Sequence, residues 1–217
     1  MVYNNIMSNK PYSKPKVYHN VLSEDQRRTM IDLVEAGLAA GNAWEMDSTS
    51  MSRWDVNIDL PEDVQNIFDE IAKDFWNFDE KHINHYIKTT AIIYKTNNPM
   101  GAYSALHPHA DTSTCGIILD YQLASNIDWP LGVDDNLFYL EDNDLLYLHA
   151  NIDWHWRPKK YFRPSDYQIQ LLVQYETGTL YQEKPELLDI QNDESMREIT
   201  NEFFDKYTKI QEEKDGI

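Results

Sequence analysis

The stretch from Tyr167 to Tyr175 is the most constraining pattern in this chain of 217 residues. Apolar or aromatic side chains alternate there with glutamines. Because successive side chains of a strand point to opposite faces, one face is apolar and the other carries mostly amides. Further strands are predicted from short apolar runs between Asn, Asp, Gly and Pro clusters, at residues 91–94, 116–119, 137–140 and 145–148.

Helices are predicted on both sides of these strands. Ser23 and Gln26 form a capping box, and apolar residues then follow at helical spacing until Gly41. A second amphipathic helix begins near Pro61, with acidic residues in its first turn. A third runs from Asp193 into a charged end that we expect to fray.

The expected fold is therefore mainly β with flanking helices, a β-sandwich or small barrel. An apolar content of 41% suffices for a core, and no repeat or linker divides the chain, so we expect one domain. Its parts are an extended lead-in, a helical support, a strand core, and a C-terminal helix with its tail, at residues 1–20, 21–88, 89–178 and 179–217.

Composition excludes several functional classes. With 37 acidic and 19 basic residues, the formal charge of −18 repels phosphate backbones and anionic lipid, so we expect no nucleic-acid partner. The single cysteine, Cys115, rules out an internal disulfide and a multi-thiolate metal site. No signal-like opening and no long apolar run are present, which predicts neither secretion nor a membrane span and makes the cytoplasm the default location.

A candidate metal site consists of His109-Ala110-Asp111 and of His155, 44 residues after Asp111. Residues two apart in a strand point the same way, so His109 and Asp111 can hold one ion. The strand-like runs that follow allow the chain to cross a small sandwich and return. Two imidazoles and one carboxylate on one side of a metal are typical of non-haem Fe(II), because they leave open positions for a co-substrate and dioxygen.

His149 is the alternative third ligand, since it directly follows the apolar run 145–148. We prefer His155 because it lies just beyond that strand between Trp154 and Trp156, whose indoles are placed to shield a metal from water. The choice between the two histidines stays open at the level of sequence.

These residues resemble the Fe(II)- and 2-oxoglutarate-dependent oxygenases, in particular the small enzymes grouped with prolyl 4-hydroxylases. The resemblance runs from about Tyr94 to Tyr175. It rests on Tyr94 before a turn, His109-Ala110-Asp111, the strand Gly116–Tyr121, Trp129-Pro130-Leu131, Asn143-Asp144 where relatives often have Gly-Asp, and His155-Trp156-Arg157. It implies a double-stranded β-helix, or jelly roll, with residues 89–178 as its core and helices packed on one sheet.

The resemblance also implies chemistry. Fe(II) would be held by His109, Asp111 and His155, and 2-oxoglutarate would be the co-substrate. Its oxidation to succinate and CO2 would accompany hydroxylation of a peptidyl or small-molecule substrate. Aromatic residues near the site are expected to form the substrate pocket, namely Trp129, Trp154 and Trp156.

The distal carboxylate of 2-oxoglutarate needs a cation, since a buried carboxylate is costly unless it is paired. Relatives usually carry an Arg or Lys for this at the start of the strand after the last His, where this sequence has Pro164, Ser165 and Asp166. We rank Arg163 first, Arg157 second and Lys95 third, because Arg binds carboxylates bidentately. Tyr94 is expected to add a hydroxyl and Gln168 an amide.

Two other functions remain open. A cupin-type jelly roll without 2-oxoglutarate is suggested by Gly101, His107 and His109, although the Glu of that motif is replaced by Ser113 and Thr114. A non-catalytic β-barrel that binds a partner would use its histidines for packing only.

Overall fold

The computed structural model describes residues 14–45, 53–74, 85–111, 116–176 and 194–216, apart from a few side chains at the edges of these ranges. In chain order its elements are β1 (Lys16–Tyr18), α2 (Glu24–Ala39), β2 (Trp44–Glu45), β3 (Arg53–Ile58), α3 (Glu62–Asp74), β4 (His85–Lys95), β5 (Ala102–His109), β6 (Ile117–Ser125), β7 (Leu131–Val133), β8 (Asn136–Phe138), β9 (Leu145–Leu148), β10 (His155–Phe162), β11 (Tyr167–Glu176) and α6 (Glu194–Asp215).

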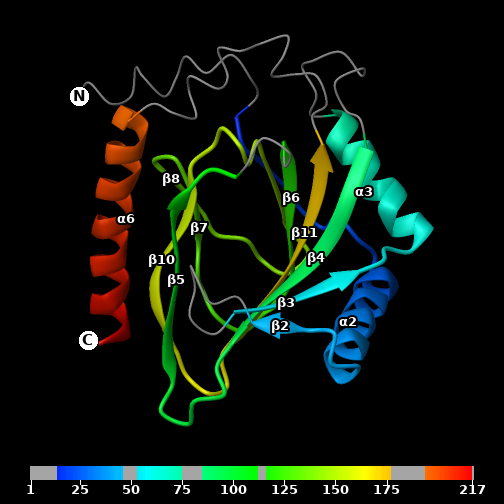
Figure 1. Cartoon of the computed structure of the whole chain (residues 1–217), viewed down its shortest axis with the longest axis horizontal. Coiled ribbons are helices and arrows are strands. Elements are labelled where there is room, and N and C mark those ends of the chain that lie inside the picture. The colour runs from blue at the N-terminus through cyan, green and yellow to red at the C-terminus, as the bar shows by residue number, and fades with distance from the viewer. Residues whose placement is uncertain (1–13, 46–52, 75–84, 112–115, 177–193, 217) are drawn as a thin grey trace.

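Two antiparallel sheets face each other with helices on their outer sides (Figure 1). The larger sheet has the order β1-β9-β6-β11-β4-β3-β2, and the smaller one has the order β5-β10-β7-β8. Helices α2 and α3 lie on the larger sheet and α6 on the smaller (Figure 1). The predicted mainly β jelly roll with flanking helices is confirmed. No helix among the described residues is both long and apolar enough to cross a membrane.

Strand β11 lies in the middle of the larger sheet, between β4 and β6. Its apolar face, with Leu171, Val173 and Tyr175, joins the core that α2 and α3 cover. Its amide face turns to the interior between the sheets, where Gln170 and Gln174 line a cavity. The alternation in the sequence of β11 therefore places its apolar side chains under the helices and its glutamines between the two sheets.

Helix α6 seals the outer face of the smaller sheet. The Trp156 ring of β10 lies 5.9 Å from the Phe204 ring and 6.0 Å from the Tyr207 ring. The predicted fraying of its charged end is wrong. Asp215 accepts a hydrogen bond from the Tyr161 backbone N–H at 3.1 Å and forms an ion pair with Lys160 at 3.4 Å. These contacts attach the last helical turn to β10.

Three strands lie in segments that we expected to be an extended lead-in or helical support. Strand β1 adds to the edge of the larger sheet by pairing with β9, and β3 pairs with β4 while β2 pairs with β3. They are short, and the charges at Arg53 and Asp55 hide the alternation of β3. The helical support at 21–88 therefore also extends the sheet.

The backbone at Asn143 accounts for the Asn143-Asp144 motif, where relatives often have Gly-Asp. Its φ of +73° lies in the left-handed region that glycine adopts most easily and asparagine tolerates. Its side chain accepts the Leu22 N–H and donates to the Leu22 carbonyl, both at 2.8 Å. Asn143 thus has a backbone conformation that glycine also adopts easily, and its side chain connects this turn to the segment before α2.

Gly132 of β7 provides a test of how closely β7 packs against the Trp156 ring of β10. A Cβ added there would lie 2.2 Å from Cε2 of Trp156. We expect Gly132→Ala to lower the free energy of unfolding by about 1–3 kcal/mol, measured by urea denaturation. The double variant Gly132→Ala/Trp156→Phe should lose less than the sum of the single variants, because the smaller ring makes room. Additive losses would contradict this explanation.

Candidate metal centre and its cavity

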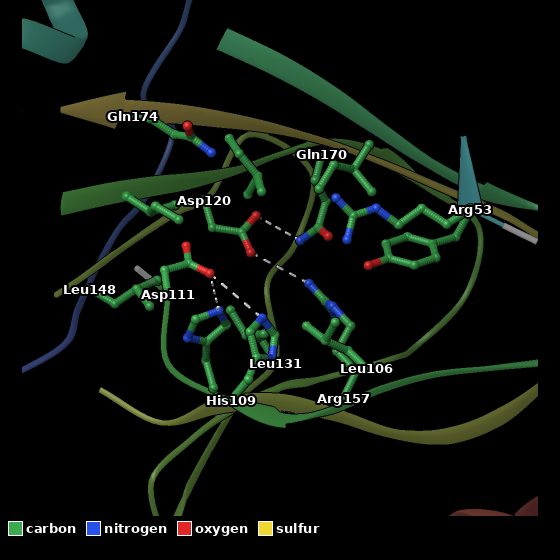
Figure 2. Close-up of a pocket in the computed structure, with 15 residues that line it drawn as sticks. Arg53, Leu106, His109, Asp111, Asp120, Leu131, Leu148, Arg157, Gln170 and Gln174 are labelled. Atoms are coloured by element: carbon green, nitrogen blue, oxygen red, sulfur yellow. Dashed lines mark hydrogen bonds and ion pairs between the residues drawn. The ribbon is translucent and has the colours of Figure 1, made fainter. Parts of the chain in front are cut away.

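His109, Asp111 and His155 come together at one end of the interior. His109 ends β5, Asp111 follows two residues later, and His155 begins β10 directly opposite His109. The carboxylate Oδ1 of Asp111 lies 3.7 Å from Nε2 of His109 and 3.9 Å from Nε2 of His155. One possible ligand atom from each residue lies within 4.8 Å of the others. Figure 2 shows His109 and Asp111 turned toward each other.

A β-bulge in β5 sets the direction of His109. His155 pairs with His109 and Arg157 pairs with Leu106, so two steps along β10 correspond to three along β5. A second irregularity, between Arg157 and Lys160, restores the register. Bulges re-aim side chains in this way next to functional sites.

The extra residue gives the two histidines of the His107-Pro108-His109 segment different environments. His109 lines the cavity, whereas the ring of His107 lies 5.2 Å from Phe204 of α6. Pro108 lacks an N–H, and it is tolerated here because β5 is an edge strand with a bulge. His107 therefore does not join the metal cluster. The cupin motif would need both His107 and His109 as ligands, so this motif is not formed here.

Hydrogen bonds leave the metal-facing nitrogen of each histidine free. Nδ1 of His109 lies 2.8 Å from the His107 carbonyl, and Nδ1 of His155 lies 3.1 Å from the Asp153 carbonyl. Because a carbonyl only accepts, each Nδ1 carries the proton and each Nε2 carries a lone pair. Burial, followed by the neighbouring His155, lowers the pKa of His109 to about 4, so its ring is neutral at pH 7. This donor set suits a divalent transition metal.

A cavity of about 130 Å³ extends from the metal cluster between the two sheets. Its apolar wall consists of Ile92, Leu106, Ile118, Leu131, Leu148 and Leu172. Its polar wall beyond the cluster consists of Arg53, Tyr94, Asp120, Arg157, Gln170 and Gln174. Figure 2 shows Arg157, Asp120 and Gln170 meeting in the middle of this space, with Arg53 farther from the cluster.

Arg157 is the buried cation of the cavity, with 2% exposure. It is two residues from His155, so both side chains point inward. Nη1 donates to the Trp129 carbonyl at 2.8 Å, and Nη2 lies 3.6 Å from Oδ2 of Asp120 without a hydrogen bond of its own. Asp120 is fixed by Gln170, whose Nε2 donates to it at 2.8 Å. Burial lowers the pKa of Arg157, and Asp120 partly offsets this.

The other predicted co-substrate residues lie in different places. Arg163 is exposed in the turn after β10, where its backbone N–H donates a hydrogen bond to Asp166. It is not among the described residues that line the cavity. Lys95 follows Tyr94, so it points to the other face of β4 and also lies outside the lining. Tyr94 and Arg157 line the cavity, while Gln168 is buried nearby without lining it. The structure therefore places our second choice of cation, not the first, beside the metal cluster.

The three predicted pocket tryptophans pack outside the cavity. Trp156 alternates with His155 and Arg157 and so points to α6. The indole of Trp129 donates to the Pro158 carbonyl and lies edge-on to Tyr94 with ring centroids 4.9 Å apart. Trp154 is half-buried, and none of the three is among the described residues that line the cavity. Of the three, Trp129 contacts two residues of the cavity lining, Tyr94 and Arg157.

Two charged residues of the lining, Arg53 and Asp120, were missed in the sequence. Arg53 had no signal because β3 was not recognised. Asp120 had one, since it is an acidic residue inside the predicted strand Gly116–Tyr121, and a charge in a buried strand is rarely without a role. His149, the alternative ligand, is buried with Nε2 3.2 Å from the Tyr147 hydroxyl and is not part of the metal cluster.

The fold is similar to that of solved Fe(II)/2-oxoglutarate oxygenases. A prolyl hydroxylase from Trichoplax adhaerens, in complex with a hypoxia-inducible factor peptide, matches with a TM-score of 0.59 at 13% identity over 82% of this chain and 88% of the other. A prolyl-4-hydroxylase from Pseudomonas putida gives 0.58 at 10% identity, over 76% and 93%. The epimerase SnoN from nogalamycin biosynthesis gives 0.56 at 10%, over 80% and 82%.

By sequence alone the chain has no such match. No protein-family model and no curated protein matches it. At identities this low the likeness establishes the fold, so the chain has the jelly roll of these oxygenases together with a His-x-Asp…His cluster.

Asp120 gives a test of the cavity's electrostatics. Burial raises its pKa from 3.8 to about 6, and Arg157 only partly opposes this. The folded protein therefore binds this proton more tightly than the unfolded chain, and stability is lost as the pH rises from about 4 through 6. We expect the metal-free protein to lose about 2 kcal/mol of unfolding free energy over this range relative to Asp120→Asn, measured by urea denaturation at each pH. Parallel pH profiles of the two proteins would contradict the assignment.

Proposed function

We propose that this protein is an Fe(II)- and 2-oxoglutarate-dependent oxygenase. The observation that carries the proposal is the convergence of His109, Asp111 and His155 at the end of a cavity between two jelly-roll sheets. Both histidines present Nε2 to the same carboxylate, and their Nδ1 protons are already engaged. Three protein ligands on one side leave the cavity side open for a chelating co-substrate.

Different residues of the cavity would bind the metal, bind the co-substrate and exclude water. His109, Asp111 and His155 would hold the metal, and the cations that line the cavity, Arg157 and Arg53, would attract a dianionic keto acid. Apolar side chains of both sheets, such as Leu131 and Leu172, exclude water from the bound acid. Bound Fe(II) would supply the redox chemistry in which dioxygen converts 2-oxoglutarate to succinate and CO2 and oxidises the substrate.

Hydroxylation of a peptidyl or small-molecule substrate is the reaction that we propose. The prolyl hydroxylases of similar fold favour it, although the epimerase SnoN, also of similar fold, catalyses a different reaction. The cytoplasmic location expected from the sequence belongs to the same proposal.

The proposal predicts a spectroscopic signal. Under anaerobic conditions, Fe(II) and 2-oxoglutarate together should give the weak visible charge-transfer band of a chelated keto acid. His109→Ala and His155→Ala should abolish the band, because each removes a ligand. Admission of air should then yield succinate from the wild-type protein but not from these two variants.

His107→Ala is the matched control. It removes a histidine two residues from a ligand whose ring contacts α6 instead of the cluster, so the band should persist. Fe(II) binding without a 2-oxoglutarate band would favour the cupin-type alternative. Absence of metal binding in the wild type would favour the non-catalytic barrel.

A further inference from the structure

We propose that the distal carboxylate of the co-substrate is bound by two arginines, Arg157 of β10 and Arg53 of β3, together with the Tyr94 hydroxyl. This inference rests on the proposed function and names residues of the same cavity. It places the anchor on the smaller sheet and on a strand near the edge of the larger sheet instead of on β11.

Strand β11 offers no cation for this purpose. Its residues that line the cavity are Gln170, Leu172 and Gln174, and the segment before it contains Pro164, Ser165 and Asp166. Arg163 in that turn is exposed. A dicarboxylate between the sheets would keep an uncompensated charge unless another element supplied the cation.

Arg157 has an unused donor at the right place. Its side chain is buried, and Nη2 has no hydrogen-bond partner although it lines the cavity. Asp120 neutralises part of its charge from 3.6 Å, a distance longer than a hydrogen bond. A buried guanidinium with a free N–H is costly on its own and binds an anion favourably.

Arg53 is oriented toward the same space by its own strand. Asp55 accepts its Nε at 2.7 Å and its Nη2 at 2.8 Å, so the plane of the guanidinium is fixed and Nη1 is left for a ligand. In the register of β3 with β4, Arg53 lies directly opposite Tyr94. Figure 2 shows the Arg53 side chain reaching into the cavity from the side away from the metal cluster. It therefore faces the far end of a ligand that is chelated at the cluster.

Tyr94 of β4 lies opposite Arg53 of β3 in the larger sheet. It lines the cavity and is 1% exposed. Burial raises the pKa of its hydroxyl, while the charges of Arg53 and Arg157 lower it in part. This phenol therefore keeps its proton at pH 7 and has a hydrogen to donate to a bound carboxylate.

Asp120 has the opposite effect on a dicarboxylate. It is the counter-ion of Arg157 inside the cavity, and a bound carboxylate would face its like charge. Asp120→Asn keeps an acceptor for Gln170 and removes the charge. The proposed anchor therefore implies that Asp120 weakens co-substrate binding.

The test is a titration of the anaerobic Fe(II) protein with two keto acids, followed by the charge-transfer band. 2-Oxoglutarate is compared with 2-oxopentanoate, which has the same chain length but no distal carboxylate. Arg53→Gln and Arg157→Gln should each weaken the binding of 2-oxoglutarate by about tenfold or more, as expected for a lost charge-assisted hydrogen bond. The affinity for 2-oxopentanoate should change less than about twofold in both variants. Arg163→Ala, the matched control, should change neither. Asp120→Asn should bind 2-oxoglutarate several-fold more tightly.

Each contrary result has a distinct meaning. Unchanged 2-oxoglutarate binding in Arg53→Gln overturns the two-arginine anchor and leaves the oxygenase proposal intact. Equal losses for both keto acids overturn it as well, because the arginines would then support only the fold. Absence of any band in the wild type defeats the proposed function itself. If Arg157→Gln does not fold, shown by circular dichroism, Arg53→Gln and Arg163→Ala still decide the question.

Discussion

The antiparallel pairing of β5 with β10 is the interaction on which the rest of the site depends. It brings His109 opposite His155, and its bulge turns His109 inward beside Leu106. The two-residue alternation of β10 then determines that Arg157 joins the cavity while Trp156 joins α6. Metal ligands, cation and outer packing thus all follow from the register of one strand pair.

The interior between the sheets contains charges that a purely apolar core would exclude. Asp120 and Arg157 are both nearly fully buried, and their mutual attraction only partly offsets the loss of hydration. Gln170 and the Trp129 carbonyl supply hydrogen bonds to them, which reduces the remaining cost. Polar groups that are fixed in this way lie between the sheets, while the largest apolar core lies under α2 and α3.

Sequence reasoning was most successful where a pattern is local. The alternation of β11, the capping box at Ser23 and the His109-x-Asp111 pair needed only neighbouring residues. It missed Arg53 and did not predict that Trp129, Trp154 and Trp156 lie outside the cavity lining, because these positions depend on which strands pair and on which face a residue points. Trp156 and Arg157 are adjacent in sequence, yet they lie on opposite sides of the smaller sheet. Periodicity would have separated them if the polar strand β10 had been recognised.

The contacts of α6 with β10 have a consequence for the order of folding. The candidate metal ligands lie between residues 109 and 155, whereas the helix that covers β10 begins at Glu194. During synthesis the complete set of ligands leaves the ribosome before Phe204 and Tyr207 are available to cover Trp156. For that interval the nascent chain carries all three candidate metal ligands, while Trp156 still lacks the aromatic rings that cover it in the folded protein.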